Sequence, residues 1–210
     1  CNLDKSDVIS NPDLPSIYQL PLTFHEQEFD VRVLGKLNLP VQRIDIAPWK
    51  KLVAQIDDAF SQTVRIGIIA KYIATGEFEL QDSYASLLEA INHASWHTRK
   101  KAEIVFINAE ALEKNEPDAL KKLYDADAII VPIGWGSRGV EGKIKAIEHA
   151  RTQKVPYLGL CYGMQLAAIE FARNVLGLSD AHTEEVAPQT ANPLIHSIPF
   201  DPKYQRIKGE

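Results

Sequence analysis

The chain has 210 residues, of which 45% are hydrophobic and 24% are charged, and a formal net charge of −5. A chain of this length and composition buries a substantial core, and an acidic balance without a basic stripe argues against a nucleic-acid partner. No apolar run approaches the roughly 18 residues of a membrane-spanning helix, and no stretch has the pattern of a signal peptide, so no membrane partner is expected.

The first 63 residues lack a regular alternation of strands and helices. Residues 1–40 contain four prolines and are predicted to be the irregular end of another domain, with one short helix between His25 and Leu37. Residues 41–63 are interpreted as a linker with a short helix that opens at Pro48, because apolar residues follow it at intervals of three and four.

From residue 64 onward, apolar strand patterns alternate with helical patterns. Strands are predicted at residues 64–70, 102–109, 128–133 and 155–160, and helices at 83–96, 112–123 (interrupted near Pro117), 141–153 and 164–176. The alternation predicts an α/β fold with a doubly wound, mostly parallel sheet and helices on both faces. Ligands of such sheets bind at the carboxyl ends of the strands.

The last predicted strand ends in Gly159-Leu160-Cys161-Tyr162-Gly163, and a helical pattern follows at once. A nucleophile between two glycines at a strand-to-helix turn is the pattern of a nucleophile elbow, in which the central residue is strained and exposed. The free N–H groups at the start of a helix favour a thiolate there. The alternative is an inert buried cysteine. The other cysteine, Cys1, is far away in the sequence, so no disulfide framework is expected and a reducing, cytoplasmic location fits.

A glycine-rich turn, residues 132–139, follows the third predicted strand. Its backbone N–H groups are suited to stabilising the oxyanion that forms when a thiolate attacks a carbonyl carbon. An ordinary strand-to-helix loop is the alternative interpretation. A phosphate-binding loop is disfavoured, because no Lys-Ser or Lys-Thr pair follows the glycines.

Two runs closely resemble the CTP synthase family. They are Gly-Trp-Gly-Ser-Arg-Gly-Val-Glu-Gly-Lys at 134–143 and Pro-Tyr-Leu-Gly-Leu-Cys-Tyr-Gly-Met-Gln at 156–165, with further support from 169–178 and 183–185. The resemblance implies that 1–40 is the end of an amidoligase domain and 41–63 an interdomain linker. It also implies that 64–210 is a class I glutamine amidotransferase domain with a flavodoxin-like sheet, truncated before its His-Glu pair.

The resemblance implies a reaction in which glutamine is hydrolysed and its ammonia converts UTP to CTP. Cys161 is then the nucleophile, and the N–H groups of Gly134 and Tyr162 form the oxyanion hole. The predicted glutamine-binding residues are Gly134, Tyr162, Gly163, Met164, Gln165 and Glu185.

The other ligands implied by the resemblance are ATP with Mg²⁺, which activates UTP, and GTP as an allosteric activator. Pro12, Asp13 and Leu14 fall where the amidoligase domain touches ATP. Arg138 is a candidate for the response to GTP, with an ion pair that anchors the loop as the alternative. No metal ligand is predicted in this chain, and the complete enzyme is expected to be a homotetramer.

The chain departs from the family pattern at several positions. Ile133 replaces a glycine, Trp135 replaces a phenylalanine and Tyr162 replaces a leucine, while residues 74–78 are interpreted as a small insertion. The family activates its thiol with the histidine and glutamate of a His-Pro-Glu run, and none of the six histidines of this sequence precedes Pro-Glu. We therefore expect these 210 residues alone neither to make CTP nor to hydrolyse glutamine well.

Two other functions stay open at this point. The first is the glutaminase subunit of a different class I amidotransferase, although the run at 136–143 argues against it. The second is a non-catalytic, regulatory remnant that binds glutamine or a partner without turnover. A cysteine hydrolase of another family matches nothing beyond the elbow.

Overall fold

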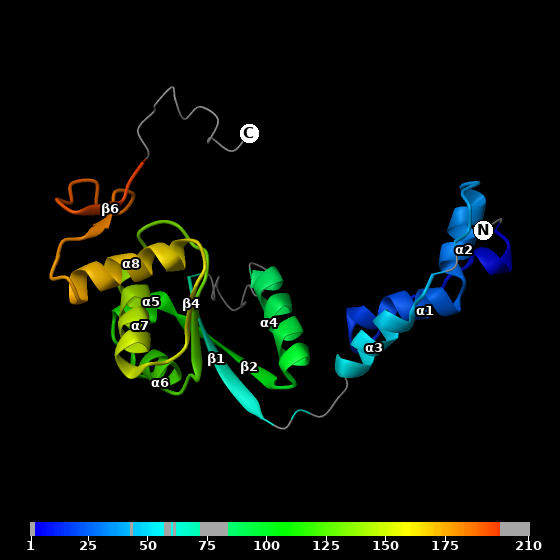
Figure 1. Cartoon of the computed structure of the whole chain (residues 1–210), viewed down its shortest axis with the longest axis horizontal. Coiled ribbons are helices and arrows are strands. Elements are labelled where there is room, and N and C mark those ends of the chain that lie inside the picture. The colour runs from blue at the N-terminus through cyan, green and yellow to red at the C-terminus, as the bar shows by residue number, and fades with distance from the viewer. Residues whose placement is uncertain (1–2, 43, 57–59, 61, 72–83, 198–210) are drawn as a thin grey trace. The chain divides into compact units, whose positions relative to one another are not determined.

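A computed structural model describes residues 3–42, 44–56, 60, 62–71 and 84–197 (Figure 1). The chain divides into two compact units. The first consists of Cys1–Ser61 with Trp96–Arg99, and the second of Gln62–Ser95 with Lys100–Glu210. The predicted insertion at 74–78 lies outside the described residues. Among the described helices, none has the length and hydropathy that a transmembrane segment requires.

The first unit is helical where the sequence led us to expect a mostly irregular chain. Pro21 lies in the first turn of a helix, where a missing N–H costs nothing, and so does not break it. The single helix expected between residues 25 and 37 is replaced by parts of two, because Glu28 adopts a left-handed conformation with φ of 56°. The elements are η1 (Lys5–Asp7), η2 (Ile17–Gln19), α1 (Leu20–Glu26), α2 (Phe29–Lys36) and α3 (Ala47–Ile56).

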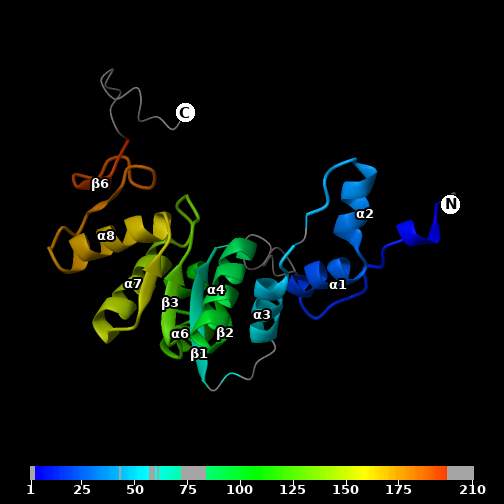
Figure 2. The same cartoon turned by 45° about the vertical axis from the view of Figure 1, so that its right-hand side comes forward.

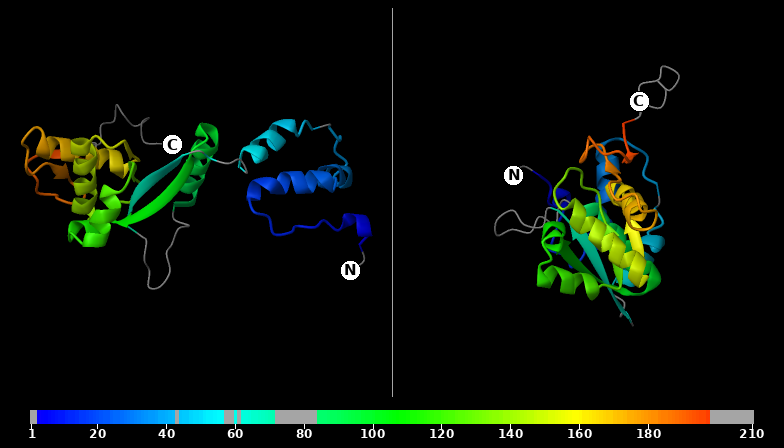
Figure 3. Two further views of the ribbon diagram at one scale, coloured as in Figure 1. Left: turned by 90° about the horizontal axis from the view of Figure 1, so that it is seen from below. Right: turned by 90° about the vertical axis from the view of Figure 1, so that its left-hand side faces the viewer.

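The second unit contains a four-stranded sheet in the order β2-β1-β3-β4, and all its strand pairs are parallel. This confirms the predicted doubly wound α/β fold. The strands are β1 (Thr63–Ala70), β2 (Lys101–Asn108), β3 (Ala128–Val131) and β4 (Tyr157–Gly159). Figure 3 shows the long strands β1 and β2 side by side. The strand order reverses between β1 and β3, and the carboxyl ends at this reversal are where such sheets bind ligands.

The helices of the second unit follow the predicted sequence of elements. They are α4 (Ala85–Thr98), α5 (Ala109–Glu113), α6 (Pro117–Tyr124), α7 (Val140–Gln153) and α8 (Tyr162–Asn174). The predicted interruption near Pro117 is confirmed, because this proline opens α6. A short parallel pair, β5 (His182–Thr183) and β6 (Pro193–Ile195), was not predicted, since strands of two and three residues show no periodicity.

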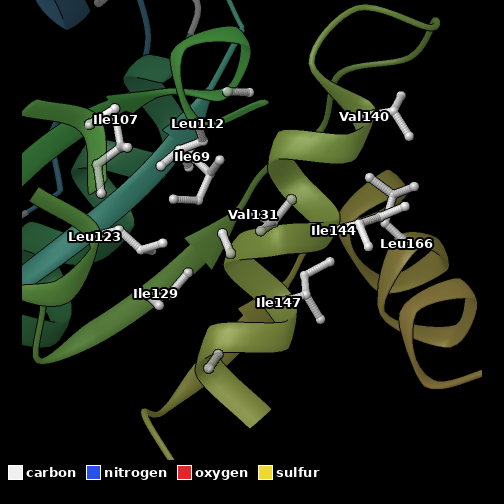
Figure 4. Close-up of a cluster of buried hydrophobic side chains, with 14 of the residues drawn as sticks. Ile69, Ile107, Leu112, Leu123, Ile129, Val131, Val140, Ile144, Ile147 and Leu166 are labelled. Atoms are coloured by element: carbon white, nitrogen blue, oxygen red, sulfur yellow. The ribbon is translucent and has the colours of Figure 1, made fainter. Parts of the chain in front are cut away.

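Alternating residues of the strands face two different cores. Ile68 and Ile130 pack with α4 on one face, whereas Ile69 and Ile129 pack with α5, α6, α7 and α8 on the other (Figures 1 and 2). Figure 4 shows the larger core, in which side chains from β1, β2 and β3 meet those of α7 and α8. Burial on both faces explains the nearly continuous apolar runs in the strands.

Helices α5 and α7 approach each other closely at Gly142. A Cβ built on this residue lies 1.8 Å from the carbonyl oxygen of Ala109. Because the obstacle is backbone, no side-chain rotation relieves the clash. This contact fixes the start of α7, and with it the end of the glycine-rich turn.

We predict that Gly142→Ala lowers the free energy of unfolding by about 3 kcal/mol, because α7 has to move away from α5. Gly67→Ala is the matched control. Its Cβ lies 3.0 Å from the terminal Cδ1 of the Ile107 side chain and 3.2 Å from the methyl group of Ala126, so small shifts accommodate it and the expected loss is about 1 kcal/mol. Urea denaturation measures both values. Equal losses for the two variants would contradict the close approach.

Candidate active site

Cys161 lies between the end of β4 and the first residue of α8, and its side chain is exposed. Its backbone has φ of 52° and ψ of −103°, a strained conformation for a residue with a Cβ. The predicted nucleophile elbow is therefore present in its conformation as well as in its sequence. A thiol here stands at the carboxyl edge of the sheet, next to the N–H groups that open a helix.

The two glycines of the elbow are needed for space. A Cβ on Gly163 lies 2.0 Å from the carbonyl oxygen of Val131, and a Cβ on Gly159 lies 2.7 Å from the backbone of Gly163. The first turn of α8 thus rests directly on the end of β3. The hydroxyl of Tyr157 donates a hydrogen bond of 2.8 Å to the Gly163 carbonyl, which ties β4 to the same turn.

The glycine-rich turn reaches this elbow through an aromatic contact. Trp135 packs against Tyr162, with ring centroids 5.5 Å apart and planes inclined by 36°. Tyr162 is completely buried, and its hydroxyl has no hydrogen-bond partner among the described residues. Burial, with smaller contributions from Glu185 and Glu141, raises the pKa of this phenol to about 12. The structure therefore brings together two predicted loops that are far apart in the sequence.

Glu185 also joins this group. Its Oε1 accepts a hydrogen bond of 3.0 Å from the N–H of Gly136, in the middle of the glycine-rich turn. The residue reaches the turn from the segment after β5, whose own geometry is set by the side chain of Thr183 accepting from the Glu185 N–H at 3.3 Å. A carboxylate beside the elbow is suited to binding the ammonium group of an amino-acid substrate.

The remaining predicted residues of the elbow lie on the first turn of α8. Met164 is exposed, with 57% of its surface accessible. The Oε1 of Gln165 is buried and has no hydrogen-bond partner among the described residues. An unpartnered buried acceptor beside a nucleophile is suited to a donor group on a substrate.

Arg138 stands at the far end of the glycine-rich turn. Its Nε and Nη2 both donate to Oε1 of Glu110, at 2.8 and 2.5 Å. This ion pair anchors the turn to α5, which is the structural role that the sequence analysis gave as the alternative to a response to GTP. A role of Arg138 toward GTP stays a prediction.

The family comparison agrees with this geometry. The sequence profile described as "Glutamine amidotransferase class-I" matches residues 79–199. The chain belongs to this family.

Similar proteins point to one branch of the amidotransferases. The CTP synthase of Geobacillus kaustophilus is 44% identical over 210 residues, which is 100% of this chain and 38% of that protein. The CTP synthase of Clostridium acetobutylicum is 43% identical over 199 residues, 95% of this chain and 36% of that protein. The chain thus spans between a third and two fifths of the length of these relatives.

A solved structure shares the fold. It is described as "Trypanosoma brucei CTPS - glutaminase domain with bound acivicin" and matches with a TM-score of 0.57 and 37% sequence identity. The match covers 63% of this chain and 49% of that chain. The predicted similarity to CTP synthases is therefore confirmed in sequence and in structure.

The predicted ATP contacts lie in the first unit of this amidotransferase chain. Pro12, Asp13 and Leu14 form an extended segment between η1 and η2, and the first two are exposed. In the part of the chain that the structure describes, no group of three or more His, Cys, Asp or Glu residues is arranged to hold a metal ion. The assignment of these residues to ATP, and of 1–40 to an amidoligase domain, stays a prediction.

One histidine of the second unit is paired with a carboxylate close to the start of α7. The Nε2 of His182 lies 3.7 Å from Glu141, and its Nδ1 accepts a hydrogen bond of 2.8 Å from the N–H of Thr183. Burial, followed by the charge of Arg173, lowers the pKa of this imidazole, and Glu141 partly opposes the shift. Both ring nitrogens are thus engaged away from the thiol, so His182 is not placed as its base.

Sequence reasoning gave no role to two lysines at the amidotransferase site. Lys71 directly follows β1 and is 6% exposed, and its Nζ donates to the carbonyls of Trp135 and Gly136 at 2.5 and 2.9 Å. Lys143 is completely buried in the first turn of α7, and its Nζ donates to the Gly134 carbonyl at 3.4 Å. A signal was present for Lys143, because Val140 and Ile147 place it on the inward stripe of the helix.

The burial of Lys143 predicts a pH-dependent stability. Burial, and then the charge of Lys71, lowers the pKa of Lys143 from 10.5 to about 8. Between these two values the unfolded chain binds more protons than the folded one, so the free energy of unfolding rises with pH. Below pH 8 Lys143 is protonated in both the folded and the unfolded chain, and burying its charge lowers the free energy of unfolding by about 3 kcal/mol.

We predict that Lys143→Met makes this rise smaller than in the wild type, because methionine has no proton to lose, and only the contribution of Lys71, whose pKa burial also lowers, remains. The measurement is urea denaturation of the wild type and the variant at several pH values across the window. Lys145→Met is the control on the same helix and is expected to keep the wild-type slope. An unchanged slope in Lys143→Met would show that the ammonium is not buried at a cost.

Proposed function

We propose that this chain carries the glutaminase site of a CTP synthase, with Cys161 as the nucleophile. The observation that supports this most strongly is the strained thiol between Gly159 and Gly163, next to the glycine-rich turn that follows β3. A cysteine nucleophile, backbone N–H groups that can face an oxyanion, and a carboxylate within one loop cluster are the parts that amide hydrolysis of an amino acid requires.

The reaction proceeds in two steps at this site. The Sγ of Cys161 attacks the side-chain carbonyl carbon of glutamine, and the oxygen becomes an oxyanion facing the N–H groups of Gly134 and Tyr162. The proton released by the Cys161 thiol passes to the amide nitrogen, the carbon–nitrogen bond breaks, ammonia leaves, and a thioester remains on the sulfur. Water attacks the thioester, which releases glutamate and restores the thiol.

The substrate is held by the residues around the elbow. Glu185 binds the α-ammonium group of glutamine by charge, and Gly163, Met164 and Gln165, in the first turn of α8, are the other proposed contacts. Because the side chain of Glu185 also accepts from Gly136, substrate binding and the shape of the turn are linked.

The wider reaction is proposed from the resemblance to the CTP synthase family. The ammonia aminates UTP, which ATP activates with Mg²⁺ in an amidoligase domain, and GTP stimulates the hydrolysis through the turn that bears Arg138. Pro12, Asp13 and Leu14 are proposed contacts of ATP, and the complete enzyme is proposed to be a cytoplasmic homotetramer. Reading the coding sequence beyond Glu210 tests this proposal, since a His-Pro-Glu there supplies the missing base and its absence argues for another amidotransferase.

The role of Cys161 as the nucleophile can be tested with a substrate that needs no histidine to protonate its leaving group. We predict that the γ-p-nitrophenyl ester of glutamate acylates Cys161 in a single turnover, because p-nitrophenolate leaves without a proton. Release of p-nitrophenolate and the mass of the acylated protein measure the step, and Cys161→Ala is expected to abolish both. A matched control ester, made from butyrate and lacking the charged groups of glutamate, should react more slowly in the wild type. Release that persists in Cys161→Ala would contradict the proposal.

A further prediction concerns Glu185. Glu185→Gln keeps a hydrogen-bond acceptor for Gly136 but loses the negative charge, so the glutamyl ester should bind about 10- to 100-fold more weakly while the maximal acylation rate changes little. The concentration dependence of p-nitrophenolate release separates the two. A loss confined to the maximal rate would assign Glu185 to the turn alone.

A further inference from the structure

The glycine-rich turn is held from within the protein by two ammonium groups. Lys71 donates to the carbonyls of Trp135 and Gly136, and Lys143 donates to the carbonyl of Gly134. The hydrogen-bond partners of both groups are backbone oxygens of one three-residue segment rather than carboxylates. Both side chains are more than nine-tenths buried.

This arrangement destabilises the folded state. A buried ammonium without a carboxylate partner loses its hydration and regains only part of it from carbonyl dipoles. Burial lowers the pKa of both lysines, and for Lys143 the proximity of Lys71 adds to the effect. Buried charges without full hydrogen-bond or ionic partners are expected mainly at functional sites, where they support the activity and lower the stability.

The lysines determine which way the peptide groups of the turn face. In a trans peptide the C=O and the following N–H point in opposite directions. The Trp135 carbonyl points to Lys71, and the N–H of Gly136 on the other side of the same peptide points to Glu185. Lys71 therefore presents this N–H to the site, and Glu185 occupies it.

Lys143 acts on the neighbouring part of the site. Its Nζ lies 3.4 Å from the Gly134 carbonyl oxygen and 5.6 Å from the centroid of the Tyr162 ring. A Cβ on Gly134 would lie 3.1 Å from this nitrogen. The bond to the Gly134 carbonyl fixes the peptide that carries the Trp135 N–H, so Lys143 anchors the position of Gly134 and approaches the side chain of Tyr162 rather than either donor N–H.

We propose that Lys71 and Lys143 are positioning residues of the oxyanion hole. By holding the carbonyls of Gly134, Trp135 and Gly136, they keep Gly134, whose own N–H lies on the preceding peptide, in place beside Tyr162. The inference rests on the proposed glutaminase function. Neither lysine touches the substrate or the thiol in this scheme. Their effect is confined to the steps in which a carbonyl oxygen becomes negatively charged.

Two reactions of the same sulfur separate this role from an effect on the thiol. Acylation by the γ-p-nitrophenyl ester of glutamate passes through an oxyanion, whereas alkylation by iodoacetamide displaces iodide and forms none. In Lys143→Met and in Lys71→Met, we expect acylation to slow about 10- to 100-fold, less than the roughly 100- to 1,000-fold loss on removal of an oxyanion-hole donor, because the donors themselves remain. Alkylation of Cys161 is expected to keep its wild-type rate.

Lys145→Met is the matched control. This lysine lies on the same helix as Lys143, and its Nζ donates to the Leu112 carbonyl at 3.3 Å, on the α5 side. Both reactions should proceed at the wild-type rate in this variant. Circular dichroism and thermal melting establish that each variant is folded, and methionine is chosen because it fills the space of lysine without a buried charge.

The possible outcomes distinguish this inference from the function on which it rests. If the wild type shows no acylation that depends on Cys161, the proposed function fails. If the wild type reacts and the folded lysine variants acylate at its rate, the function stands and the positioning role is overturned. Equal slowing of acylation and alkylation would also overturn it, because the lysines would then act on the sulfur. Should one variant not fold, the other decides.

Discussion

The site depends on the contact between the first turn of α8 and the end of β3. The Val131 carbonyl comes so close to Gly163 that a Cβ at this position would lie 2.0 Å from the oxygen. With the helix held at this distance, the chain has only Leu160 and Cys161 in which to turn from β4 into α8, and Cys161 takes the strained backbone that exposes its thiol. Larger residues at either flanking glycine would lift the helix, and the thiol would move with it.

The opposite wall of the site is organised by charge instead of by close packing. The glycine-rich turn has few side chains with which to pack, so its shape comes from Lys71, Lys143 and Glu185 acting on its backbone groups. Arg138 and Glu110 fix its outer end to α5, and Gly142 fixes the start of α7 against the same helix. A loop held in this way has a defined backbone at its glycines, where peptide groups can approach a substrate closely.

Holding the turn by buried charges lowers the stability of the folded chain at the site. Two buried ammonium groups destabilise the folded chain, and a strained φ at the nucleophile adds to the cost. The large core between β3, α7 and α8 supplies the stability that offsets them. Such local costs are concentrated at the carboxyl edge of the sheet, next to the reversal of strand order between β1 and β3, whereas the rest of the unit follows ordinary α/β packing.

The sequence by itself determined the α/β alternation, the parallel sheet and the nucleophile elbow. Each of these rests on local information: apolar strand runs, helical periodicity, and the short range over which Gly159 and Gly163 crowd their neighbours. Only the tertiary structure decided that Glu185 caps Gly136, that Trp135 packs on Tyr162, and that Lys71 and Lys143 converge on one turn. These contacts join residues from different strands and helices, and a linear pattern carries no record of which side chains meet once the strand order reverses. A lysine after an apolar strand is consistent with a solvated end, and its burial follows only from the loop that folds over it.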